Sequence, residues 1–154
     1  MYILMGVEAQ SDVHYAMPIR NGLYDFINYA SQVQEKAKQH RREKDLSRKE
    51  FLSGTSKCDK IKPIITLTVY FGEGEWDGPR SLYEMLDITD ERLRSYVSDY
   101  KINLLVPKEI KHPERFQTDV RYVMEYLSVA HDKEKLNTSQ ENVLMIANAM
   151  KQKS

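Results

Sequence analysis

The stretch Pro63–Phe71 reads PIITLTVYF and decides the fold class of this chain. Most of its residues are β-branched or aromatic and none is charged, a composition that favours a β-strand, and Gly72 ends it. A strand with so little polarity is expected in the middle of a sheet, with neighbours on both edges and both faces covered.

Two further strands are predicted on either side of this one in the sequence. The apolar run Tyr2–Val7 leads into Glu8 and Gln10 and reads as an interior strand, buried on both faces, whose polar residues emerge at its tip. The run Lys101–Val106 is stopped by a proline.

A long helix is predicted from Pro18 to Lys49, because Pro18 suits a first turn and apolar residues follow at helical spacing. The stripe expected to be buried consists of Leu23, Phe26, Ile27, Ala30 and Val33. Beyond it, Glu35–Glu50 carries seven Lys or Arg residues against four acids. A solvated helix face is the plain reading of this segment, and contact with a DNA backbone is the alternative.

Three more helices are predicted, at Ser81–Leu86, at Pro113–Ala130 and from the capping box Thr138-x-x-Glu141 to Met150. The order strand, helix, strand, small helix, strand, helix, helix favours an α/β fold with a mostly parallel sheet. We expect a single domain over residues 1–154, with a core at 1–106 and a C-terminal helical extension at 107–154. Trp76 is expected to pack beneath its loop rather than stack on bases.

Composition excludes several classes of protein. The chain has 154 residues and a formal net charge of zero, so overall charge gives no attraction to nucleic acid or to an anionic membrane. The single cysteine, Cys58, excludes an internal disulfide framework, and no cysteine–histidine cluster has the spacing of a zinc site. No apolar run reaches about 18 residues, the length of a membrane span. No signal peptide is evident, so the expected location is the cytoplasm.

Glu8 and Gln10 are the candidate catalytic residues. Side chains two positions apart on a strand share a face, so both can reach one ion. Hydrolysis of a phosphodiester with Mg²⁺ requires carboxylates that hold the metal beside the phosphate. A solvated strand end is the alternative reading of the same two residues.

The segment Gly6–Asp25, GVEAQSDVHYAMPIRNGLYD, resembles the GIENQ…IHYAMPVRNMLYD segment of the PD-(D/E)XK nuclease family transposases, relatives of the recombination-promoting nucleases. The resemblance spans roughly residues 3 to 136, and its most specific stretches are Glu75–Pro79 (EWDGP) and Asp99–Leu104 (DYKINL). It implies a partial restriction-endonuclease-like core of strand, helix, strand and strand with C-terminal helices, and a DNA endonuclease that depends on Mg²⁺ or Mn²⁺.

The resemblance also implies roles for single residues. Glu8 is the expected metal ligand, and Gln10 takes the place of the usual lysine. Arg20 and Tyr24 match an Arg…Tyr pair of the family and are expected to reach a phosphate or to brace the carboxylate.

One part of the family pattern has no counterpart in the chain. In this fold a helix and a hairpin precede the Glu8 strand, and the hairpin supplies the first metal-binding aspartate. The resemblance therefore implies an N-terminally truncated member that is inactive or weak alone, since a lone glutamate with a neutral glutamine holds Mg²⁺ poorly. Asp12 is the nearest spare carboxylate.

The alternative function is that of a non-catalytic remnant of a mobile-element protein, which oligomerises or binds DNA or another partner. The apolar edge of the first strand predicts a homo-oligomer formed through residues 2–8, or coverage by later helices of the same chain.

Overall fold

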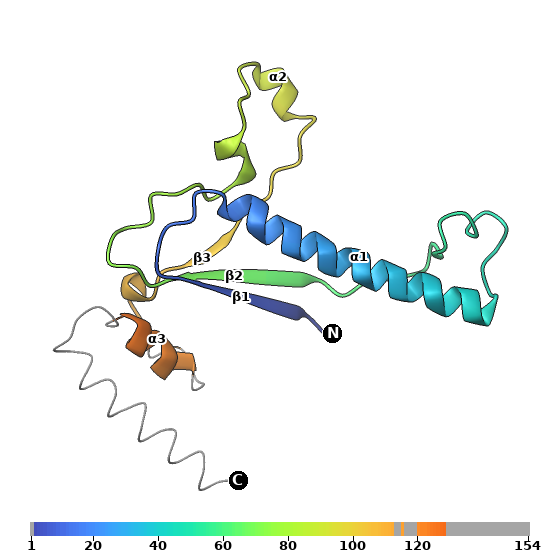
Figure 1. The fold of residues 1–154 in the computed structure, drawn as a ribbon, viewed down its shortest axis with the longest axis horizontal. Coiled ribbons are helices and arrows are strands. Elements are labelled where there is room, and N and C mark those ends of the chain that lie inside the picture. The colour runs from blue at the N-terminus through green and yellow to red at the C-terminus, as the bar shows by residue number, and fades with distance from the viewer. Residues whose placement is uncertain (1, 113–114, 116–119, 129–154) are drawn as a thin grey trace, which may run out of the picture. The chain divides into compact units, whose positions relative to one another are not determined.

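The computed structural model describes residues 2–112, 115 and 120–128, and shows a mixed α/β chain (Figure 1). Its elements, in order, are β1 (Leu4–Gln10), α1 (Met17–Glu43), β2 (Ile64–Tyr70), the 3₁₀ helix η1 (Leu82–Met85), α2 (Glu91–Arg94), β3 (Asn103–Leu105), the 3₁₀ helix η2 (Pro107–Glu109) and α3 (Val120–Ser128). Every helix in this described part is too short or too polar to cross a bilayer.

The strands form a small parallel sheet in the order β1-β2-β3, with β2 in the middle as its sequence predicts. The Leu4 N–H donates to the Pro63 carbonyl at 3.0 Å, and the Phe71 N–H donates to the Gln10 carbonyl at 3.0 Å. These bonds fix the register of β1 against β2. Gly6 is required at the contact, because a Cβ there would lie 2.6 Å from the Thr66 hydroxyl oxygen.

The prediction that β1 is an interior strand buried on both faces is wrong. β1 lies at an edge of the described sheet, and the exposed fractions of Met5 and Val7 are 66% and 63%. In the described part of the chain only β2 pairs with it, so an apolar run does not by itself place a strand in the interior.

The chain forms two compact units. Of the described residues, the first unit takes those within Met1–Val7, Ala16–Leu67 and Pro79–Asn103, and the second takes those within Glu8–Tyr15, Thr68–Gly78 and Leu104–Ser154.

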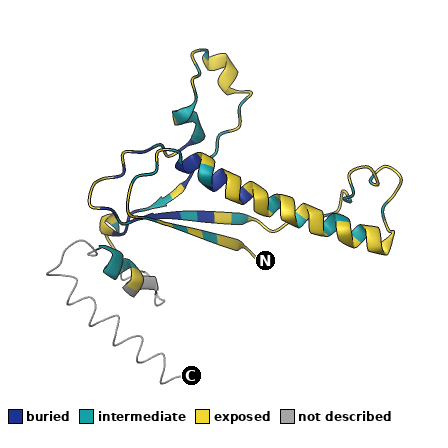
Figure 2. Ribbon diagram, in the orientation of Figure 1, coloured by how far each residue is buried: buried dark blue, intermediate teal, exposed yellow. Residues whose placement is uncertain are grey.

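In the first unit α1 presents an unexpected face to the sheet. The predicted apolar stripe is exposed, with Leu23 at 56%, Phe26 at 65% and Ile27 at 53% (Figure 2). The buried residues of the helix are instead Met17, Pro18, Asn21, Gly22 and Asp25. The prediction of the buried face is therefore wrong, because small and polar residues make the contact.

Asp25 explains why this polar face is buried. Its carboxylate accepts a hydrogen bond from the Thr66 hydroxyl at 2.6 Å and another from the Tyr100 hydroxyl at 2.7 Å. The ring of Tyr100 lies against Gly22, where a side chain would meet it at 3.5 Å. Hydrogen bonds to an ionised acceptor are strong, and they orient the helix on β2.

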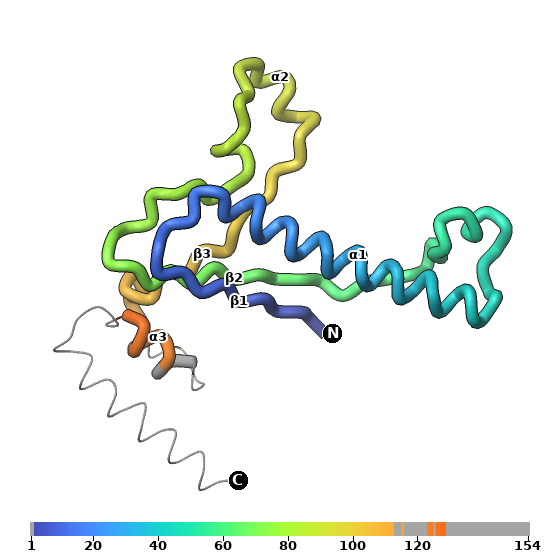
Figure 3. The backbone as a smooth tube through the Cα atoms, in the orientation of Figure 1, coloured from blue at the N-terminus to red at the C-terminus, as the bar shows by residue number. Residues whose placement is uncertain are grey.

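α1 ends at Glu43, six residues before the predicted end at Lys49. Lys44 takes the left-handed conformation, with φ 54° and ψ 36°, and its N–H donates to the His40 carbonyl at 2.7 Å. The chain then turns back toward β2, as Figure 3 shows. Glu50 organises these turns, because it accepts hydrogen bonds from the hydroxyls of Ser47 and Ser56 and from the N–H of Lys57, which lower its pKa to about 2.

His40 ties the end of α1 to the returning segment. Its Nδ1 lies 2.7 Å from an Asp45 oxygen, and its Nε2 lies 2.9 Å from an Asp59 oxygen. Asp59 also accepts the Ser56 N–H at 2.9 Å. Two carboxylate partners favour the form in which both ring nitrogens donate, the protonated imidazole.

Stability should fall as pH rises through the titration of His40. The hydrogen bonds to Asp45 and then to Asp59 raise its pKa above the ordinary value of 6.5. A raised pKa contributes stability that is complete below 6.5 and is lost as pH passes the folded value. Thermal unfolding between pH 5.5 and 9 should therefore show a Tm advantage over His40→Gln that shrinks with rising pH. A difference in Tm between wild type and His40→Gln that stays constant with pH would contradict the bridge. The matched control is His112→Gln, a substitution at an exposed position.

The remaining elements agree with the sequence only in part. η1 stands where a short helix is predicted, and β3 is shorter than the predicted strand Lys101–Val106. α2 is not predicted at all. α3 covers Val120–Ser128 of the predicted helix Pro113–Ala130. The rest of that helix lies outside the described residues, except for Arg115. The whole predicted helix that ends at Met150 also lies outside the described residues. Val123 of α3 is 52% exposed.

Candidate functional site

Glu8 and Gln10 project together from the end of β1. Both side chains are half-buried, and the Gln10 amide Nε2 donates to a Glu8 carboxylate oxygen at 3.5 Å. Strand alternation explains this, since positions i and i+2 share a face. The two candidate catalytic residues therefore have the predicted relation to each other.

The donor set around Glu8 is small for a hard divalent cation. Glu8 offers one anionic group, and the amide oxygen of Gln10 is neutral. Asp12 is exposed and accepts a hydrogen bond from the Ser11 hydroxyl at 2.8 Å. Mg²⁺ binds through carboxylates and phosphates in a near-octahedral shell. Glu8 and Gln10 alone supply only part of such a shell.

Within the described chain, the group of three metal-binding side chains close enough to share an ion lies elsewhere, at His40, Glu43 and Asp45. The contacts of His40 with Asp45 and Asp59 use both ring nitrogens, and Glu43 accepts a hydrogen bond from the Gln39 amide at 3.0 Å, so each member of this cluster already has a partner in the protein. We therefore read it as a structural bridge and not as a cofactor site.

Arg20 and Tyr24, the candidate supporting residues, contact each other on α1. The guanidinium carbon of Arg20 lies 5.9 Å from the centroid of the Tyr24 ring, which is a cation–π contact between residues one helical turn apart. The Arg20–Tyr24 pair lies in the first unit, and the Glu8–Gln10 pair lies in the second.

The loop after β2, in the second unit, is held by buried contacts. Trp76 is 6% exposed, packs edge-on against Tyr70 with ring centroids 5.3 Å apart, and donates to the Gly78 carbonyl at 2.8 Å. Lys108 donates to the carbonyls of Gly72, Glu73 and Gly74 at 2.5–3.3 Å. Trp76 is thus a packing residue, as the sequence predicts.

A pocket of about 610 Å³ beside this loop is acidic. Its charged lining residues are Asp12, Glu73, Glu75 and Asp77. The Tyr15 hydroxyl donates to Asp77 at 3.0 Å, and this hydrogen bond raises the pKa of Tyr15. The four carboxylates repel anions, so this surface does not favour a phosphate by itself.

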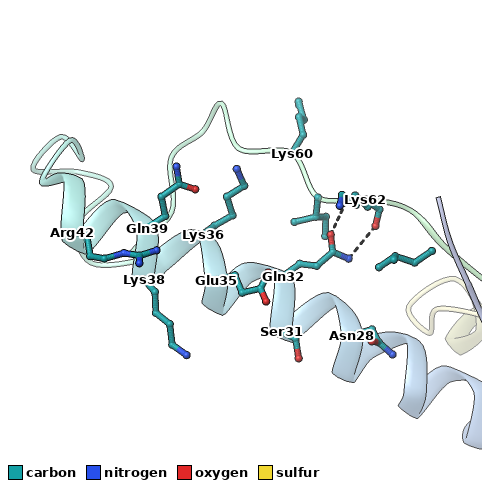
Figure 4. A pocket seen from close by; sticks show the side chains of 12 residues that line it. Asn28, Ser31, Gln32, Glu35, Lys36, Lys38, Gln39, Arg42, Lys60 and Lys62 are labelled. Atoms are coloured by element: carbon teal, nitrogen blue, oxygen red, sulfur yellow. Dashed lines mark hydrogen bonds between the residues drawn. The ribbon is translucent and has the colours of Figure 1, made fainter. Parts of the chain in front are cut away.

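A basic groove of about 780 Å³ lies in the first unit (Figure 4). The second half of α1 forms one wall, and the segment that leads into β2 forms the other. The charged residues that line it are Glu35, Lys36, Lys38, Arg42, Lys60 and Lys62. The positive residues on α1 are evident from the sequence. Lys60 and Lys62 are not evident as part of the same surface, because they lie 18 or more positions after Arg42.

The structure therefore brings the four residues predicted from the sequence into two pairs, and it adds an acidic pocket and a basic groove. Comparisons of this chain with family models, with curated proteins and with solved structures found no match.

Proposed function

We propose that this chain is a DNA endonuclease-type domain of the transposase-like PD-(D/E)XK kind, dependent on Mg²⁺ or Mn²⁺, with a partial restriction-endonuclease-like core and weak or no activity of its own. The observation that carries the proposal is the Glu8–Gln10 pair at the carboxyl end of a parallel strand. Ligand sites of open parallel sheets form at that end of the strands. The resemblance of Gly6–Asp25 to the family supports it.

Each candidate residue has a role in this proposal. Glu8 ligates the metal ion, and Gln10 stands in the lysine position, where it holds the Glu8 carboxylate through its amide. Arg20 and Tyr24 are proposed to contact a phosphate of the DNA, and their cation–π contact holds the guanidinium in one orientation. The low activity follows from the donor set, in which one carboxylate stands with one neutral amide.

Replacing Glu8 with glutamine tests the role of its charge. We expect purified protein to nick supercoiled plasmid at or near background with Mg²⁺ or Mn²⁺, and any activity above background to disappear in Glu8→Gln. Calorimetric titration with Mn²⁺ should show weak binding that the same variant abolishes, because the substitution removes the anionic ligand and keeps the side-chain shape.

The control variant for this experiment is Ala9→Ser, since Ala9 lies on the opposite side of the strand from Glu8 and Gln10. Robust cleavage that depends on Glu8 would contradict the low activity proposed for the chain. Mn²⁺ binding that is equal in wild type and Glu8→Gln would contradict the metal site.

A second candidate function is that of a non-catalytic relative that oligomerises or binds DNA or another partner. The edge of β1 favours it, because within the described residues that edge has no partner strand, and an edge with apolar side chains such as Met5 and Val7 is a template for pairing with another copy. Light scattering at high concentration distinguishes a dimer, which supports this candidate, from a monomer, which removes self-association. DNA binding without metal would support the binding role.

A further inference from the structure

The lining of the basic groove is strongly asymmetric in charge. Five cations, Lys36, Lys38, Arg42, Lys60 and Lys62, face one acid, Glu35. The whole chain has equal numbers of cationic and anionic residues. Positive charge therefore outweighs negative charge along the lining of this groove.

Most of these cations are available for a ligand; the exception is Lys62, whose ammonium lies 5.9 Å from the centroid of the Tyr2 ring in a cation–π contact. None of the five forms a salt bridge with an acid in the part of the chain that the structure describes. In contrast, Arg92 and Arg94 on α2 are paired with Asp90 and Glu91. Figure 4 shows the amino groups of Lys36, Lys38 and Lys60 extending away from the backbone.

The two walls of the groove are held together by a neutral side chain. The Gln32 amide Nε2 donates to the Lys62 carbonyl at 3.2 Å, and the Lys62 N–H donates to the Gln32 amide oxygen at 2.7 Å. The helix and the segment before β2 are thus fixed against each other before any ligand arrives. A preformed surface lowers the cost of ordering on binding.

The arrangement of the cations suits an extended polyanion. Lys38 and Arg42 are four residues apart on the helix, about 6 Å along its axis, which corresponds to about two nucleotides at a rise of about 3.4 Å per strand. Cations on the opposite wall continue the same positive surface. Apolar residues contribute only Leu4 and Ile61 to the lining, too little for insertion into a membrane.

We propose that this groove binds the phosphate backbone of a nucleic acid, independently of Glu8 and of any metal ion. The contacts are charge-assisted hydrogen bonds from lysine and arginine to phosphate oxygens, so binding is insensitive to base sequence and strongly dependent on salt.

Fluorescence anisotropy with labelled 20-nucleotide duplex DNA, single-stranded DNA and single-stranded RNA, in EDTA and between 50 and 200 mM salt, tests this proposal. For duplex DNA the slope of log K against log salt should lie near −4, since each neutralised phosphate contributes about −0.9. The variant Lys38→Gln/Arg42→Gln/Lys60→Gln should bind at least tenfold more weakly and lose about three units of slope. The three probes identify which nucleic acid is preferred.

The matched control is Arg48→Gln/Lys49→Gln/Lys57→Gln, which removes three exposed cations that do not line the groove. It should bind nearly as wild type, and Glu8→Gln should bind as wild type even if the nuclease proposal fails. Circular dichroism checks that every variant is folded. Equal losses in the two triple variants, no binding to any of the three probes at 50 mM salt, or binding to anionic vesicles alone would overturn the proposal.

Discussion

Asp25→Ala is expected to lower the free energy of unfolding by about 3 to 6 kcal/mol, since two charge-assisted hydrogen bonds of about 1.5–3 kcal/mol each are removed. The carboxylate is 7% exposed and accepts from Thr66 and Tyr100. The Thr66 hydroxyl, on a residue that is 5% exposed, would lose its carboxylate acceptor in the interior. Urea unfolding followed by far-ultraviolet circular dichroism measures the loss.

Two conservative variants control this experiment. Asp25→Asn keeps the volume and one acceptor oxygen, so it should lose less stability than the alanine variant. Tyr100→Phe keeps the ring against Gly22 and removes one hydrogen bond. In the wild-type protein, desolvation and then the hydrogen bond to Asp25 raise the pKa of Tyr100, so the Tyr100 hydroxyl is a donor at neutral pH. A loss below about 1 kcal/mol in Asp25→Ala, less than one such bond contributes, would show that the carboxylate does not anchor α1.

Trp76→Ala should destabilise the second unit by a similar amount, about 3 to 5 kcal/mol, the usual range for removing a buried tryptophan. The indole fills the space beneath the loop, packs edge-on against Tyr70, and donates to Gly78. Alanine leaves a cavity and an unsatisfied carbonyl. Differential scanning calorimetry measures the loss, because the variant has no tryptophan left for fluorescence.

Trp76→Phe separates packing from hydrogen bonding. It retains an aromatic ring against Tyr70 and loses the bond to the Gly78 carbonyl, so its cost should be well below that of the alanine variant. If both variants were equally unstable, the hydrogen bond rather than the ring would hold the loop. If neither were affected, Trp76 would not be a packing residue.

The strands were predictable because their residues act locally. The run Pro63–Phe71 has the β-branched and aromatic composition of a central strand, and β2 is central. The relation between Glu8 and Gln10 follows from strand alternation alone, which needs no knowledge of the rest of the fold. Trp76 was predicted to pack beneath its loop, and its burial confirms this.

The buried face of α1 was not predictable from hydrophobicity. Asp25 is polar, and it is buried because Thr66 and Tyr100, about 40 and 75 residues further along the chain, supply its hydrogen-bond partners. A helical pattern assigns Leu23 and Phe26 to the interior, and nothing local contradicts that assignment. The buried face was predicted wrongly because the long-range hydrogen bonds of Asp25 outweigh the helical pattern of apolar residues.

The end of α1 and the cluster after it were hidden for the same reason. Lys44 adopts a conformation that glycine or asparagine usually supplies, so no residue type signals the end of the helix. One local signal was present, the Ser47-x-x-Glu50 spacing, in which Glu50 accepts hydrogen bonds from Ser47. The contact of His40 with Asp59 joins residues 19 positions apart, and no spacing rule predicts it.

The bonds between Gln32 and the Lys62 peptide involve no ionised group. Their strength therefore changes little when dissolved ions screen the lysines around them. The basic groove is therefore expected to keep its geometry in concentrated salt while its attraction for anions weakens. High ionic strength would then release a bound nucleic-acid strand without changing the shape of the basic groove. The groove would bind a strand again once the salt is diluted.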